Sequence, residues 1–263
     1  MKLHVVRRGP DQIDDSARAR PPIVLLHGLF GRARNLGFFQ RRLAAGRRTL
    51  AIDLRNHGDS PHGQMDYTSM SFDLMETLAE EDALPATLVG HSMGGKAAMT
   101  LALNRPEAVH SLLVADIPPA ITGHGSSQLG RQMLRIKFPA YLNRSGADAL
   151  LSDAIPNADI RNLMLQNLRL GENPGWAIGL EEIVASMINI EGWPYIPEGH
   201  AYHGPTLFLA GDRSPYIKPE HHAVMARLFP NHRLEMIEEA GHWLHVENPT
   251  RFAALLEEFT EAF

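Results

Sequence analysis

The chain has 263 residues, a formal net charge of −5 and 21% charged residues, which is the composition of an ordinary globular protein of one large domain or one domain with an insertion. The acidic balance, with no block of basic residues, disfavours a nucleic-acid-binding face. Because the chain has no cysteine, disulfides, thiolate metal sites and a cysteine nucleophile are excluded.

Four apolar runs in the first half predict strands that are buried on both faces of a sheet. Helical spacing of apolar residues separates them, and this alternation predicts crossover connections and a mostly parallel sheet flanked by helices. The predicted strands are residues 23–28 (IVLLHG), 48–54 (RTLAIDL), 87–92 (TLVGHS) and 111–117 (SLLVADI), and the predicted helices are 36–45, 69–83 and 93–104.

Residues 118–204 break this alternation, because they are mostly helical in pattern and contain no convincing buried strand. The strand pattern returns at 205–212 (PTLFLAGD) and 232–242 (HRLEMIEEAGH), with a helix near 219–228 between them. A last helix is predicted after Asn248, which can cap it, with Pro249 in its first turn. The sequence therefore predicts a core of residues 1–117 and 205–263, interrupted by a helical cap of residues 118–204.

The stretch LVGHSMGGKAAM contains two overlapping motifs between a strand and a helix. Residues 90–96 match a phosphate-binding loop except at the position after the lysine, where a magnesium-binding hydroxyl is required and Ala97 stands. Residues 90–94 match G-x-S-x-G, the sharp turn that exposes a nucleophilic serine. The missing hydroxyl disfavours the nucleotide site and favours Ser92 as a nucleophile.

A serine nucleophile needs a histidine to take its proton, and in this chain order the histidine follows the last strand. His242 in EEAGHWLHVENP lies there, whereas His245, three residues later, is the less favoured alternative. An oxyanion hole needs two backbone N–H groups. Met93 follows the serine, and the run HGLFG supplies Leu29 or Phe30, of which Leu29 is the favoured donor.

The runs HGLFG, DLRNHGDSPH, GHSMGGK and AGHWLHVENP resemble the motifs of the α/β-hydrolase family over nearly the whole chain. Together with DIPP, they look most similar to the small bacterial esterases of the YbfF type. The resemblance implies the α/β-hydrolase fold with a helical cap inserted after strand 6 of the family's sheet. It also implies the cleavage of short acyl esters or thioesters.

The resemblance offers two positions for the acid that orients the histidine. After the seventh strand of the family, the run Gly211–Ser214 has Ser214 where the acid is usual, with Asp212 two residues earlier. After the sixth strand, LLVADIPPA supplies Asp116, the site that members of the similar subgroup use. We expect Asp116 to be the acid and Asp212 to be a turn residue.

The sequence therefore predicts a serine esterase in which Ser92, His242 and Asp116 are catalytic, Leu29 and Met93 form the oxyanion hole, and Phe30 lines the substrate pocket. No cofactor or metal is expected, because the neighbouring His221 and His222 point about 100° apart on a helix. Carbon–carbon bond hydrolases, perhydrolases and a catalytically inactive ligand-binding scaffold remain alternatives.

We further expect a cytoplasmic monomer or small homo-oligomer with a small-molecule substrate and no membrane partner. The first residues, MKLHVVRRGPDQIDD, lack the apolar core of a secretory signal. No apolar run approaches the roughly 18 residues that cross a bilayer.

Overall fold

The computed structural model of the protein describes residues 1–10, 20–123 and 126–263, in which seven strands form one sheet in the order β1-β3-β2-β4-β5-β10-β11. β1 runs antiparallel to β3, and the other neighbouring strands are parallel, as expected. The strands are β1 (His4–Arg8), β2 (Ile23–Leu26), β3 (Thr49–Asp53), β4 (Ala86–His91), β5 (Val109–Ala115), β10 (Thr206–Gly211) and β11 (His232–Ile237).

Register brings three functional loops to one edge of the sheet. Leu26 of β2 pairs with Gly90 of β4, and His91 of β4 pairs with Ala115 of β5. Because parallel strands end at the same edge, the loops that carry HGLFG, Ser92 and Asp116 begin side by side.

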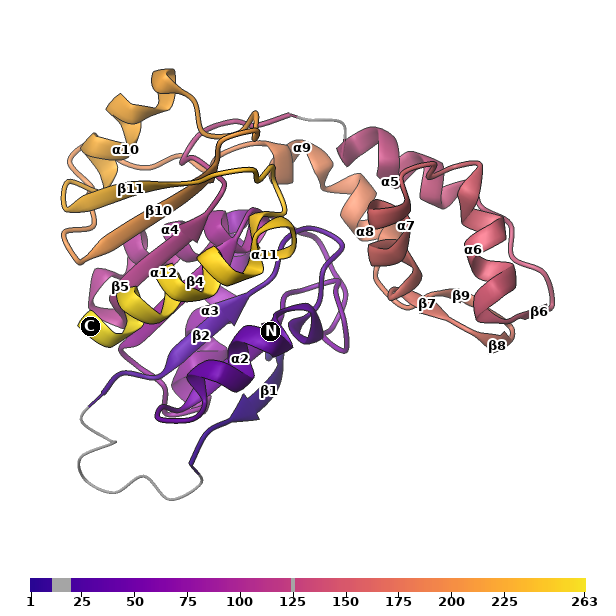
Figure 1. Ribbon diagram of the computed structural model, residues 1–263, viewed down its shortest axis with the longest axis horizontal. Helices are drawn as coiled ribbons and strands as arrows, with labels where there is room; N and C mark the ends of the chain where they lie inside the picture. The colour runs from indigo at the N-terminus through magenta and orange to yellow at the C-terminus, as the bar shows by residue number, and fades with distance from the viewer. Residues whose placement is uncertain (11–19, 124–125) are drawn as a thin grey trace.

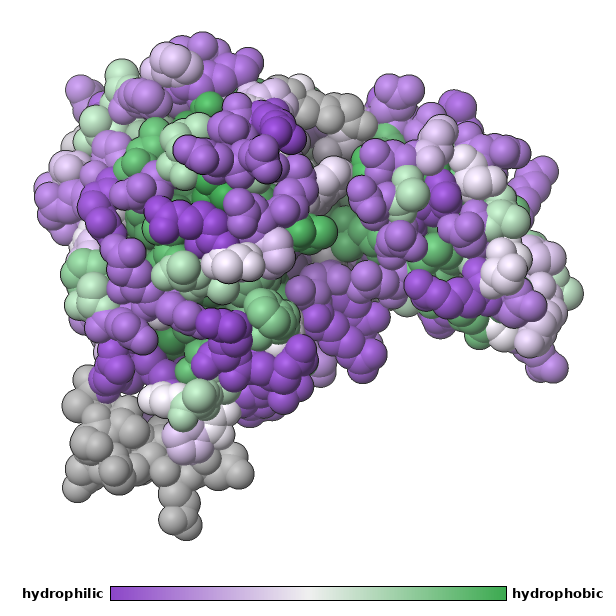
Figure 2. Space-filling view, viewed as in Figure 1, coloured by the Kyte–Doolittle hydropathy of each residue, from purple (hydrophilic) through white to green (hydrophobic). Residues whose placement is uncertain are grey.

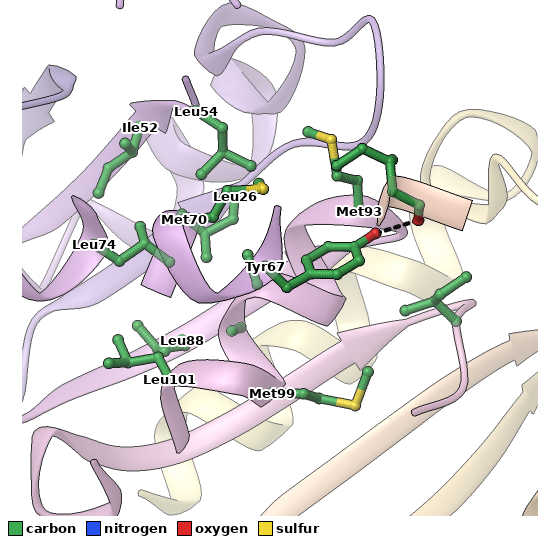
Figure 3. Packing of buried hydrophobic residues seen from close by; sticks show 14 of the residues in the cluster. Leu26, Ile52, Leu54, Tyr67, Met70, Leu74, Leu88, Met93, Met99 and Leu101 are labelled. Atoms are coloured by element: carbon green, nitrogen blue, oxygen red, sulfur yellow. Dashed lines mark hydrogen bonds between the residues drawn. The ribbon is translucent and has the colours of Figure 1, made fainter. Parts of the chain in front are cut away.

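Helices cover both faces of the sheet, so alternate strand side chains enter two cores. In β2, Val24 and Leu26 belong to one core, and Ile23 and Leu25 belong to the other. The first core packs against α3 (Tyr67–Glu80), α4 (Met93–Asn104) and α10 (His222–Leu228), and Figure 3 shows part of it between the strands and α3 and α4. The second packs against α2 (Gly37–Leu43), α11 (Leu244–Glu247) and α12 (Pro249–Ala262) (Figure 1).

Outside the insert, the described residues also form three short 3-10 helices. They are η1 (Ala33–Leu36), η2 (Pro106–Ala108) and η3 (Pro219–His221).

The insert, residues 118–204, leaves the sheet after β5, the strand that the expected fold counts as its sixth, and extends to one side of the molecule (Figure 1). Its helices are α5 (Ser126–Leu134), α6 (Arg144–Ser152), α7 (Ala158–Leu165), α8 (Leu180–Ala185) and α9 (Met187–Glu191). It also contains two antiparallel pairs of two-residue strands, β6 (Tyr141–Leu142) with β8 (Gly171–Glu172) and β7 (Leu168–Arg169) with β9 (Gly175–Trp176).

Most predicted elements lie where the sequence pattern put them. The helix predicted for 93–104 has those bounds, and α12 begins at Pro249 with the Asn248 side chain accepting from the Arg251 N–H. The pattern missed β1, because this short edge strand is only partly buried and carries no apolar run. Within the described residues, no helix is long and apolar enough to cross a membrane.

Candidate active site

Ser92 stands at a sharp bend between β4 and α4. Its φ is +51° and its ψ is −117°, a strained conformation for a residue with a side chain. A Cβ on Gly90 would come within 2.5 Å of the Gly94 carbonyl oxygen, and one on Gly94 within 2.6 Å of the Leu26 carbonyl oxygen. Only glycine fits at either position, so the motif spacing G-x-S-x-G is a packing requirement of this bend.

Ser92, His242 and Asp116 are joined by two hydrogen bonds. Nε2 of His242 lies 3.0 Å from Oγ of Ser92, and Nδ1 lies 2.7 Å from Oδ2 of Asp116. A carboxylate accepts hydrogen bonds, so the Nδ1–H donates to Asp116 and Nε2 is left to accept from the serine hydroxyl. In this tautomer the imidazole can take the serine proton.

The Asp116 carboxylate is buried and accepts two further hydrogen bonds, one from the last residue of β10 and one from the loop that follows it. The Gly211 N–H donates to Oδ1 at 3.2 Å, and the Ser214 hydroxyl donates to Oδ2. Ser214, which occupies the family's usual acid position, thus supports the acid that comes from β5.

Asp212 lies on the outside of this loop. Its carboxylate accepts from the Ala240 N–H at 3.1 Å, and its pKa is lowered, chiefly by a hydrogen bond from the Glu239 backbone. These bonds tie the loop after β10 to the loop after β11. The geometry therefore assigns Asp212 to a turn contact and leaves Asp116 as the partner of His242.

Two backbone N–H groups are suited to hold an oxyanion. Met93 is the first residue of α4, and the first N–H groups of a helix have no acceptor within the helix. Leu29 belongs to a loop that lies against the serine, since an ideal Cβ on the preceding Gly28 would be 3.4 Å from the Ser92 Cβ. Leu29 and Met93 both line a cavity together with Ser92.

Phe30 differs from its predicted place in the pocket wall. Its N–H donates to Nε2 of the buried His57 at 3.1 Å, so this N–H is unavailable to a substrate and Leu29 is the better oxyanion donor. The Phe30 ring is buried near α5, with Cζ 3.7 Å from an ideal Cβ on Gly130. Among the described residues, the cavity lining includes Leu29 and Met93 but not Phe30.

The cavity beside Ser92 is small, about 30 Å³, and the insert forms part of its wall. Ile117, Met187 and Ile190 supply apolar surface, and Figure 2 shows apolar side chains where the insert meets the rest of the molecule. α9 is held there by the Tyr67 hydroxyl, which donates to the Ile190 carbonyl at 2.7 Å (Figure 3).

Lys96 is the buried cation of this cavity. Its ammonium donates to Thr122 Oγ1 at 2.9 Å and to the Gly192 carbonyl at 2.6 Å, near the two ends of the insert. Burial lowers the pKa of Lys96 to about 7, against the raising effect of Glu191. The lysine of the rejected phosphate-loop motif thus fastens the insert to α4.

Sequence reasoning missed two side chains that hold His242. His91 donates from Nε2 to the His242 carbonyl at 2.8 Å, and the Tyr216 ring stacks on the His242 ring with centroids 3.9 Å apart. The only sequence signal for His91 was its position before Ser92. His245 packs against His91, with centroids 4.5 Å apart, and is not the residue that contacts Ser92.

Where the structure describes the chain, one cluster of side chains has the spacing of metal ligands. Ligand atoms of His4, Asp53 and Asp59 lie within 4.8 Å of one another. The Asp53 carboxylate, however, accepts from the Ala33 N–H at 2.6 Å, from the Asp59 N–H at 3.1 Å and from His4 at 2.9 Å. Because protein donors already bind both of its oxygens, the cluster is explained as loop structure.

Comparison with known proteins identifies the family of this chain. Residues 21–249 match the family model described as alpha/beta hydrolase fold. The mouse sn-1-specific diacylglycerol lipase ABHD11 is 39% identical over 255 residues, covering 93% of this chain and 82% of that protein. Esterase YbfF of Escherichia coli (strain K12) is 33% identical, covering 87% and 88%.

A solved structure titled "Marine microorganism esterase" superposes with a TM-score of 0.88 at 31% identity, covering 98% of this chain and 99% of that one. The expected fold and the resemblance stated from the motifs are therefore confirmed.

Proposed function

Because the chain belongs to the α/β-hydrolase family, we propose that it is a serine esterase that cleaves small acyl esters or thioesters through an acyl-enzyme. The observation that carries the proposal is the pair of hydrogen bonds from Asp116 through His242 to Ser92, at 2.7 and 3.0 Å. The esterase and lipase names of the mouse and Escherichia coli relatives support the same class of reaction.

In the first half of the reaction, the Ser92 oxygen attacks the acyl carbonyl carbon while Nε2 of His242 takes its proton. The negative charge on the carbonyl oxygen is held by the Leu29 and Met93 N–H groups. Asp116 stabilises the imidazolium that forms, and the stacked Tyr216 ring keeps it in plane. His242 then protonates the leaving alkoxide or thiolate.

In the second half, His242 takes a proton from water, and the resulting hydroxide attacks the acyl carbon of the ester on Ser92. The bond to the serine oxygen breaks, the proton returns to that oxygen, and the carboxylic acid leaves.

We also propose that residues 118–204 form a cap over this site and that residues 1–117 and 205–263 form the core. The proposal is supported by the insert residues Met187 and Ile190 in the cavity wall. Their apolar side chains favour an aliphatic acyl group of modest size.

The proposal is tested with nitrophenyl esters of increasing acyl length, comparing the wild-type protein with Ser92→Ala. We expect turnover of the short esters and a loss of roughly a thousandfold or more in the variant. A fluorophosphonate should label the wild type, and mass mapping should place the label on Ser92. Turnover that survives the substitution would mean another nucleophile, and tight ligand binding without turnover would mean a binding protein.

A further inference from the structure

The turn that carries Leu29 is strained at its next residue. The Gly31 N–H donates to the Gly28 carbonyl at 2.9 Å, which closes a four-residue turn, and Phe30 in its third position has φ +59°. That position requires a positive φ and is usually occupied by glycine or asparagine. A phenylalanine stays in this conformation only when its surroundings hold it there.

From the core side, a neutral histidine holds the N–H of Phe30. His57 accepts this N–H at Nε2, and its own Nδ1–H donates to the Arg55 carbonyl at 2.8 Å. Burial lowers the pKa of His57 to about 3. The ring therefore remains neutral at ordinary pH and keeps an acceptor directed at Phe30.

From the insert side, a buried amide holds the carbonyl of the same residue. Nδ2 of Asn167 donates to the Phe30 carbonyl at 2.6 Å, and the Asn167 side chain is buried. Asn167 lies two residues after α7, and its backbone bonds to Met164 and Ala177 of the insert at 2.9 and 2.7 Å. The insert thus presents a fixed donor to the strained turn.

We propose that Asn167 is a positioning residue for the oxyanion hole: by holding the Phe30 carbonyl, it keeps the Leu29 N–H directed at the reacting carbonyl, so the hole is complete only while the insert is docked on this turn. The proposal rests on the proposed esterase function. Asn167 does not line the described cavity, so it acts through the turn and not on the substrate.

Loss of the Asn167 hydrogen bond should matter because the turn has another conformation available to it. Without the Asn167 donor, the Phe30 carbonyl is buried and unpaired, and the strained φ has lost one of its two supports. Rotation of Phe30 to a negative φ then relieves the backbone strain. That rotation moves the adjoining peptide groups and turns the Leu29 N–H away from the oxyanion.

Gln166 provides a matched control, because it bonds the insert to the same part of the core without touching Phe30. Its Oε1 accepts from Nδ2 of Asn35 at 2.7 Å, and both side chains are exposed at this bond. Gln166→Ala therefore weakens docking of the insert and leaves the Phe30 carbonyl paired.

The test compares wild type, Asn167→Asp, Asn167→Ala and Gln166→Ala in ester hydrolysis. The aspartate keeps the shape of the side chain but replaces the N–H donor with an acceptor. We expect both Asn167 variants to lose about 10- to 100-fold in kcat, with KM within about threefold, since one oxyanion donor is worth roughly 100- to 1,000-fold when removed outright. Gln166→Ala should stay within about twofold of wild type.

A second readout separates positioning from general loosening. An alkyl boronic acid that forms a tetrahedral adduct on Ser92 should lose affinity by the same factor as kcat/KM, whereas affinity for the product carboxylate should be unchanged. Circular dichroism and thermal melting check that the variants are folded.

Three results would overturn the proposal: a kcat near wild type in both Asn167 variants, an equal loss in Gln166→Ala, or the failure of both Asn167 variants to fold. Failure of the esterase function itself looks different, because the wild type would then not turn over esters, or Ser92→Ala would remain active.

Discussion

At the scale of single residues, the catalytic acid is identified by its surroundings. The Asp116 carboxylate is fully buried and accepts hydrogen bonds from His242, Ser214 and Gly211. Asp212 instead accepts from the Ala240 backbone in the loop after β11. A histidine needs an oriented acceptor at Nδ1 to remain a base at Nε2, and Asp116 provides one for His242.

Replacing each acid by its amide tests this assignment. We expect Asp116→Asn to lower kcat by about 10³- to 10⁴-fold, because the amide favours the wrong histidine tautomer, and Asp212→Asn to keep activity within a few fold. Ester hydrolysis rates of the two purified variants give the ranking. The reverse order would show that the histidine is oriented from the β10 loop.

How far the sequence predicted the site depends on how each residue contributes. Ser92 and His242 were predictable because their chemistry imposes a motif and a chain order. The sequence favoured Leu29 over Phe30 as the oxyanion donor, but the physical reason, the hydrogen bond between Phe30 and His57, is visible only in the structure. Asn167 and Tyr216 act through contacts between distant segments, and no local pattern marks such contacts.

At the scale of elements, the bend between β4 and α4 depends on the close approach of the helix to β2. The Leu26 and His27 carbonyl oxygens lie 2.6 Å from an ideal Cβ on Gly94, and both belong to backbone that cannot move without disturbing the sheet. The local sequence predicted this bend, because no side chain fits at its two glycine positions. It did not predict β1, whose place depends on pairing with β3.

We expect Gly94→Ala to destabilise the protein by roughly 2–3 kcal/mol through overpacking, and to lower activity by displacing Ser92. Gly46→Ala is the matched control, because nothing lies within 4 Å of its added Cβ. Urea unfolding followed by circular dichroism measures both. Equal stability of the two variants would mean that α4 moves away from β2 without cost.

At the scale of the whole molecule, buried histidines make the stability of the fold depend on pH. Burial is the largest cause of the lowered pKa in His27, His57, His91 and His245, with His57 at about 3 and His245 at about 4. Each is neutral in the folded chain, whereas in the unfolded chain it takes up a proton near the ordinary histidine pKa of 6.5. Their stabilising effect is complete above that pH and is lost as the pH falls.

The protein should therefore become less stable in mild acid, before its carboxylates titrate. His57 and His245 should each contribute about 1 kcal/mol to the loss of unfolding free energy between pH 7 and pH 5.5. Denaturant unfolding at the two pH values measures the loss, and His245→Phe, in a site flanked by Phe39 and Phe252, should reduce it by that amount. An unchanged pH dependence in this variant would contradict the assignment.

The overall architecture was the most predictable feature, because alternating strands and helices restrict the topology to few choices. The position of the insert relative to the sheet was not predictable. It depends on individual bonds such as those from Lys96 to Thr122 and Gly192.

The small volume beside Ser92 has a kinetic consequence. At about 30 Å³, the cavity is far smaller than the roughly 300–1,000 Å³ of typical small-molecule pockets. We therefore expect its walls, which include Met187 and Ile190 of the insert, to move apart when an acyl group binds. If that movement is slower than the chemical steps, it sets the rate of turnover.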